Sequence, residues 1–111
     1  MYPDPSLYNW SDYTILIVED ESIVALDIAN SLESLGYIVA GQTDRGETAV
    51  QIVEEIQPDL VLMDIRLKGR MDGIQAARTL RQQGLVVPIL AMSAANEPTG
   101  KDFDGFLAKP V

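Results

Sequence analysis

Five polar residues spread along the chain supply the functional groups that a phosphoryl-transfer site requires. Glu19, Asp20 and Asp64 are carboxylates, Ser93 carries a hydroxyl and Lys109 carries an ammonium group. Carboxylates gathered at one place repel one another, and a hard divalent cation such as Mg2+ relieves this repulsion through oxygen ligands. An aspartate can itself accept a phosphoryl group as the nucleophile, while lysine and serine pair with the phosphoryl oxygens. The set therefore predicts an aspartyl-phosphate site that uses Mg2+, provided that the fold brings its members together.

Each of these residues stands at or just after the end of a short apolar segment. Runs of this kind are typical of strands that are buried on both faces of a parallel sheet. They alternate with segments of helical periodicity, the first of which begins near Ser22. Gly36 and Gly84 are the stop signals that follow the first and the third of these predicted helices. The other predicted helices are Glu47–Ile56 and Ile74–Gln83, and the predicted strands are Thr14–Val18, Tyr37–Gly41, Leu60–Met63, Val86–Met92 and Phe106–Ala108.

This alternation predicts an α/β fold with a doubly wound parallel sheet, because short connections between strands and helices lead to right-handed crossovers. Ligands of such sheets bind at the carboxyl ends of the strands, near the point where the strand order reverses. The ends of the first, third, fourth and last predicted strands carry the five polar residues. The expected fold therefore places them at one edge.

Length and composition predict one small domain, 14–111, after a leader or linker at 1–13. The chain has 111 residues, and no run approaches the 18 or so apolar residues that span a bilayer, so we expect a cytoplasmic protein without membrane contact. Cysteine and histidine are absent, which excludes disulfides and requires that any phosphohistidine come from a partner. The formal net charge is -9, so we expect no direct nucleic-acid binding, although acidity that only keeps a domain soluble would look the same.

Five motifs in order, ILIVEDES, PDLVLMDIRL, MDG, MSA and GFLAKP, resemble the receiver domain of two-component response regulators, the CheY-like superfamily. The resemblance covers Thr14 to Val111 and implies a flavodoxin-like sheet of five strands in the order 2-1-3-4-5. It also implies residue roles: Asp64 as phosphoacceptor, Ser93 as switch hydroxyl, Lys109 as phosphoryl-pairing lysine, Phe106 as switch aromatic, a cis Lys109–Pro110 bond, and Mg2+ ligands from Glu19, Asp20, Asp64 and the Arg66 carbonyl.

The same resemblance implies a signalling domain and not an enzyme that turns over outside substrates. Its phosphodonor would be a histidine kinase or a histidine phosphotransfer protein, in a phosphorelay, and its own catalysis would be limited to Mg2+-dependent autophosphorylation and autodephosphorylation.

Two departures from the family pattern bear on these expectations. The loop LKGRMDG after Asp64 is one residue longer than the commonest form and carries Lys68 and Arg70, whose role the sequence leaves open. Only sixteen positions separate Ser93 from Lys109, so we expect a fourth helix that is shortened or missing, and the usual fifth helix is absent from this chain. Without these two helices we expect a monomer.

Several alternatives stay open. Taken singly, Glu19 and Asp20 could be a solvated strand end and a helix cap, and Asp64 could cap a turn. A phosphohydrolase would want a second aspartate where Arg66 stands, and a nucleotide or flavin binder would want glycines in place of EDES. A pseudo-receiver used only for protein contacts and a receiver fragment of a hybrid histidine kinase both fit. Asp27, on the apolar side of the first helix, could be a buried acid or a partner contact.

Overall fold

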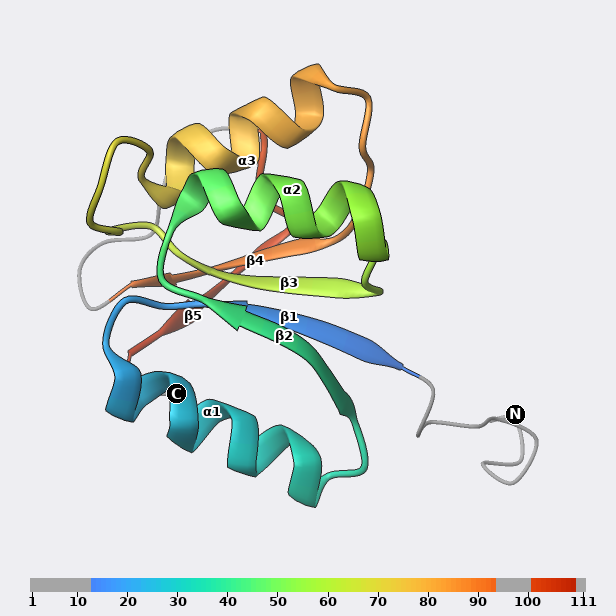
Figure 1. Cartoon of the computed structure of the whole chain (residues 1–111), viewed down its shortest axis with the longest axis vertical. Coiled ribbons are helices and arrows are strands. Elements are labelled where there is room, and N and C mark those ends of the chain that lie inside the picture. The colour runs from blue at the N-terminus through green and yellow to red at the C-terminus, as the bar shows by residue number, and fades with distance from the viewer. Residues whose placement is uncertain (1–12, 94–100, 110–111) are drawn as a thin grey trace.

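Five short parallel strands form one sheet in the order β2-β1-β3-β4-β5, which confirms the predicted topology. The computed structural model describes residues 13–93 and 101–109 (Figure 1). The elements in chain order are β1 (Thr14–Val18), α1 (Ser22–Ser34), β2 (Ile38–Thr43), α2 (Gly46–Ile56), β3 (Leu60–Asp64), α3 (Gly73–Gln82), β4 (Ile89–Ser93) and β5 (Gly105–Ala108).

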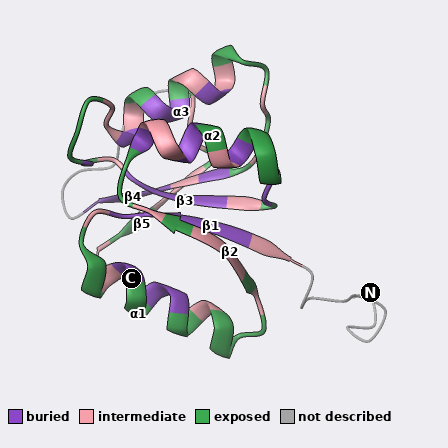
Figure 2. Cartoon of the chain, in the orientation of Figure 1, coloured by how far each residue is buried: buried purple, intermediate pink, exposed green. Residues whose placement is uncertain are grey.

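Helices cover both faces of the sheet, with α1 on one side and α2 and α3 on the other (Figure 1). Successive strand residues point to opposite faces, so β1 contributes to two separate cores. Leu16 and Val18 pack in the cluster beneath α2 and α3, whereas Ile15 and Ile17 pack with α1. Figure 2 shows the resulting buried band through β1, β3 and β4. This is why an apolar run without alternation correctly predicted a central strand.

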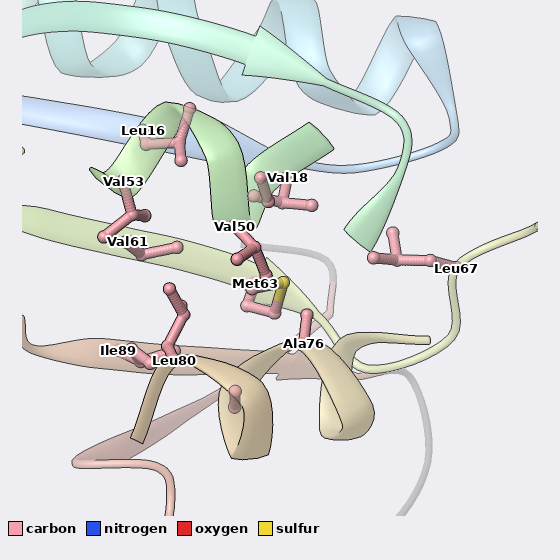
Figure 3. Packing of buried hydrophobic residues seen from close by; sticks show 12 residues of the cluster. Leu16, Val18, Val50, Val53, Val61, Met63, Leu67, Ala76, Leu80 and Ile89 are labelled. Atoms are coloured by element: carbon pink, nitrogen blue, oxygen red, sulfur yellow. The ribbon is translucent and has the colours of Figure 1, made fainter. Parts of the chain in front are cut away.

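The cluster under α2 and α3 is the larger of the two cores (Figure 3). Val61 and Met63 of β3 pack in it from the sheet, and Leu80 of α3 packs in it from the helix side. All three side chains are essentially inaccessible to solvent. Leu67 joins the cluster from the loop that follows β3 (Figure 3). Burial of side chains of this size contributes about 1.5 to 3 kcal/mol each and holds the ends of β1 and β3 in place.

The helix ends follow the predicted signals. Gly36 and Gly84 adopt positive φ angles of 95° and 80° just beyond α1 and α3, a conformation that glycine reaches at little cost. The start of α3 carries a capping box, in which the Asp72 side chain accepts from the Gln75 backbone N–H and the Gln75 side chain accepts from that of Asp72. The path of the chain from β3 into α3 is thereby defined by local interactions.

The largest differences between the predicted and observed strand boundaries are in β2 and β4. β2 begins at Ile38 and runs to Thr43, two residues past Gly41, and its pairing with β1 shifts register between Ile15 and Leu16, which leaves Ala40 of β2 as the extra residue. β4 begins at Ile89 and not at Val86. Pro88 cannot donate a ladder hydrogen bond, and its carbonyl oxygen instead accepts from the backbone N–H of Val61.

Arg81, in the last turn of α3, ties the connection into β5 to the body of the domain. Its guanidinium forms an ion pair with Asp104 at 2.8 Å, and Asp104 also accepts from the backbone N–H of Ile89. The same guanidinium donates to three backbone oxygens, those of Leu85 (3.0 Å), Val87 (2.8 Å) and Asp102 (3.2 Å). These contacts fix the start of β5, which lies at the edge of the sheet and pairs only with β4.

Residues 101–104, which precede β5, are not helical. The rest of the span in which a shortened fourth helix was considered, 94–100, lies outside the described residues, as does the Lys109–Pro110 bond that was expected to be cis. Within the described part of the chain, no helix is long and apolar enough to span a membrane.

Candidate functional site

The carboxyl ends of the strands meet at one edge of the sheet and surround a pocket of about 560 Å³. Glu19 and Asp20 directly follow β1, Asp64 and Ser93 are the last residues of β3 and β4, and Lys109 follows β5. The residues that line the pocket are Asp20, Glu21, Asp64, Arg66, Lys68, Ser93 and Lys109. The predicted set is thus brought together, with Glu19 just beneath the pocket, where it contacts Lys109.

Asp64 is held by donors on both carboxylate oxygens. The backbone N–H of Arg66 donates to Oδ1 at 2.9 Å, and the Lys109 ammonium donates to Oδ2 at 2.9 Å. The residue is only 4% exposed and nevertheless lines the pocket. Asp64 does cap a turn through Oδ1, as the alternative interpretation proposed, but turn capping does not explain why Lys109 binds Oδ2. A buried carboxylate that is oriented on both sides and open to a pocket is suited to in-line attack.

Lys109 bridges two buried carboxylates. Its Nζ lies 2.5 Å from Glu19 Oε1 and 2.9 Å from Asp64 Oδ2, and its side chain is 13% exposed. Burial by itself lowers the pKa of Lys109, but the Glu19 and Asp64 carboxylates outweigh that effect and hold the pKa above its ordinary value. The ammonium therefore stays charged at neutral pH. The backbone N–H of Lys109 also donates to the Ser93 carbonyl oxygen at 2.9 Å, which extends the β4–β5 pairing to the site.

Glu19 carries the clearest sign of electrostatic strain. The pKa of Glu19 is raised from 4.5 to about 7; burial is the largest cause, and the side-chain contact with Asp64 also contributes to the rise. Lys109 and the backbone N–H of Glu21 lower the pKa of Glu19 but do not offset the burial. This end of the sheet therefore holds more carboxylate than one buried lysine can neutralise.

The donor set fits a hard divalent cation. Carboxylate oxygens of Glu19, Asp20 and Glu21 lie within 4.8 Å of one another, and Asp64 shares the Lys109 ammonium with Glu19. Oxygen donors of this kind are the ligands that Mg2+ uses in proteins. The helix-cap alternative for Asp20 is wrong, because Glu21 is the residue that precedes α1 and no side chain caps that end.

Ser93 and Phe106 lie on the neighbouring strands β4 and β5. Ser93 is 2% exposed at the end of β4 and lines the same pocket as Asp64. Phe106 pairs with Ala91 across the β4–β5 ladder and is half-buried. Both residues are placed as the sequence predicted, and their switch roles stay predictions.

Two residues that line the pocket were not assigned to the site from the sequence. Glu21 completes the acidic triplet after β1, and Lys68 reaches the pocket from the loop between β3 and α3. The triplet was visible in the sequence, and the loop that carries Lys68 was expected beside the site, but the sequence did not assign Lys68 a role there. Asp27 proves to be exposed, so the prediction that it lies on the apolar side of α1 is wrong, and its alternative as a buried acid is excluded.

Comparisons with known proteins identify the family of this chain. A family model described as the response regulator receiver domain matches residues 15–111. The transcriptional regulatory protein PdtaR of Mycobacterium tuberculosis is 36% identical over 83 residues, which are 75% of this chain and 40% of PdtaR. The alkaline phosphatase synthesis transcriptional regulatory protein PhoP of Bacillus subtilis is 36% identical over 102 residues, 86% of this chain and 42% of PhoP. The chain thus spans about two fifths of the length of these curated relatives.

Solved structures match nearly the whole chain. The receiver domain of the sensor histidine kinase PA1611 from Pseudomonas aeruginosa, solved with a magnesium ion coordinated in the active site cleft, has a TM-score of 0.78 and 36% identity, covering 90% of this chain and 87% of that one. The signal receiver domain of a modulated diguanylate cyclase from Desulfovibrio desulfuricans has a TM-score of 0.74 and 36% identity, covering 88% and 82%. The protein described here belongs to the response regulator receiver domain family, whose members are signalling domains.

Proposed function

We propose that this chain is a phosphoacceptor of a two-component phosphorelay and that Asp64 accepts the phosphoryl group. The observation that carries the proposal is the Asp64 carboxylate, which is 4% exposed, hydrogen-bonded by Lys109 at 2.9 Å and open to the pocket. A carboxylate in this setting has a fixed orientation and a cation at hand for the charge of the incoming group. Glu19, Asp20 and Asp64, together with the Arg66 carbonyl, would hold Mg2+.

The transfer step uses residues whose positions are described above. An Asp64 carboxylate oxygen attacks the phosphorus, and an O–P bond forms as the P–N bond to the donor imidazole breaks. The imidazole nitrogen takes the bonding electron pair, and Lys109 and the Ser93 hydroxyl pair with the phosphoryl oxygens. Mg2+, when bound, supplies positive charge that offsets the carboxylates and the transferring group.

The donor is proposed to be a phosphohistidine of a histidine kinase or a histidine phosphotransfer protein. This chain contains no histidine, so the donor histidine lies outside these 111 residues. The first turns of α1, directly after the pocket residue Glu21, expose Ile23 (76%) and Leu26 (56%). Large apolar side chains exposed beside a charged site are suited to burial against a partner.

Incubation with Mg2+ and acetyl phosphate, followed by intact-mass measurement, tests the proposal. One phosphoryl group is expected on the wild-type protein and none on Asp64→Asn. Asp44→Asn is the matched control, because Asp44 is an exposed acid whose ion pair with Arg45 is long, at 3.9 Å. A folded wild-type protein that stays unmodified would favour the pseudo-receiver alternative, and a modified Asp64→Asn variant would remove Asp64 from the role.

A further inference from the structure

The loop between β3 and α3 holds Lys68 at the mouth of the pocket. Leu67, the residue before it, is buried in the core under α2 and α3, and Gly69, the residue after it, has a φ of 98° that turns the chain. Farther along, Gly73 packs directly on the backbone at Asp64 and Ile65, so that a Cβ there would overlap it. Anchored on both sides, the exposed Lys68 side chain lines the pocket that contains Asp64.

Lys68 differs from Lys109 in that its ammonium group forms no ion pair with the described residues. Lys109 already pairs with Glu19 and Asp64. Lys68 makes no ion pair or side-chain hydrogen bond with any residue in the ranges 13–93 and 101–109. Because Asp20, Glu21 and Asp64 line the same pocket, an approaching anion meets several negative charges. An available ammonium group at the rim lowers that barrier.

We propose that Lys68 is a specificity-determining residue of the site, which binds the outward-facing oxygens of strongly anionic phosphodonors. The inference rests on the proposed function of Asp64 and gives Lys68 a role beside that of Lys109. Lys109 approaches the acceptor from the buried side, and Lys68 approaches the donor from the solvent side. With acetyl phosphate, the Asp64 oxygen forms a bond to phosphorus, the bond from phosphorus to the acetate oxygen breaks, and acetate leaves with the electron pair.

The size of the effect follows from exposure. An exposed ammonium that pairs with a phosphate in solvent contributes a modest stabilisation that salt screens, so loss of Lys68 should slow the reaction by roughly two- to fivefold. The effect should grow with the charge of the donor. Acetyl phosphate is a dianion near neutral pH, whereas phosphoramidate carries less net negative charge.

Arg70 provides a matched control in the same loop. It is exposed like Lys68 and has the same charge, but it does not line the pocket. Initial rates of phosphorylation are measured by intact mass for wild type, Lys68→Ala, Lys68→Arg and Arg70→Ala, with Mg2+ and each donor, at about 50 mM and about 500 mM NaCl. Circular dichroism confirms that each variant is folded.

We expect Lys68→Ala to react roughly two- to fivefold more slowly with acetyl phosphate at low salt, and to show a smaller loss of rate with phosphoramidate or at high salt. Lys68→Arg should recover most of the rate, and Arg70→Ala should match wild type. A Lys68→Ala rate equal to wild type, or an equal loss in Arg70→Ala, overturns the role of Lys68 and leaves that of Asp64 intact. A wild-type protein that takes up no phosphoryl group overturns the proposed function and this inference with it.

Discussion

The buried Glu19 carboxyl makes the stability of the metal-free protein depend on pH. In the folded protein Glu19 keeps its proton up to about pH 7, whereas the unfolded chain releases it near pH 4.5. Below pH 4.5 the carboxyl is protonated in both states. Between pH 4.5 and 7 the Glu19 carboxyl is ionised in the unfolded chain but still protonated in the folded protein. A rise in pH therefore stabilises the unfolded chain, and the free energy of unfolding falls across this window.

The raised pKa sets the size of this loss. A pKa that moves from 4.5 to about 7 corresponds to on the order of 3 kcal/mol above pH 7, at about 1.4 kcal/mol for each tenfold change in proton affinity. The Glu19 side chain has no solvent exposure, so solvent screening reduces this value little. The raised pKa of Lys109 changes the free energy of unfolding only near and above pH 10.5, the ordinary pKa of lysine, so Lys109 adds no change between pH 4.5 and 7.

Urea denaturation in EDTA at about pH 5 and about pH 7.5 measures the effect, with an expected loss of roughly 2 kcal/mol between the two conditions. Glu19→Gln, which cannot ionise, should remove most of this loss. Glu33→Gln, an exposed acid at the end of α1, should leave it unchanged. Mg2+ at the higher pH should restore stability to the wild-type protein, because a cation that binds only the folded state stabilises that state.

Two results would refute this reasoning. Equal stability of the metal-free wild-type protein at both pH values would show that Glu19 ionises without a cost in the folded state. A Glu19→Gln variant with the full wild-type pH dependence would assign the loss to other groups.

Three further predictions follow from the geometry. Arg81→Ala should lower the free energy of unfolding by about 2 kcal/mol in urea denaturation, because it removes an ion pair and three hydrogen bonds to backbone oxygens. Arg78→Ala, at an exposed position of the same helix, should change it by less than about 0.5 kcal/mol. Similar losses in both variants would contradict the role of Arg81 in holding the start of β5. Asp20→Ala should abolish the Mg2+-induced shifts of backbone NMR signals near Glu19 and stabilise the metal-free protein, and an unaltered Mg2+ response would count against the metal site. With Mg2+ and beryllofluoride the chain should remain monomeric in size-exclusion chromatography with light scattering, and a dimer whose contacts map to 94–109 would defeat that expectation.

Local signals explain why much of the fold could be predicted. Continuous apolar runs predicted β1 and β3 because a central strand buries both faces, as Ile15 and Leu16 do in opposite cores. Glycine positions predicted two helix ends because positive φ is a property of a single residue. The start of β4 was misplaced because the apolar residues from Val86 onward resemble a strand, whereas hydrogen bonding across the sheet begins only after Pro88.

The sequence by itself determined which functional groups are available and that they follow strand ends, since both depend on residue type and local periodicity. Only the tertiary structure decided their interactions. Lys109 and Asp64 are 45 positions apart, and their contact depends on the pairing of β5 with β4 and of β4 with β3. The raised pKa of Glu19 and the position of Lys68 at the pocket are likewise consequences of burial and loop anchoring. Such properties arise from contacts between distant segments, which no local pattern encodes.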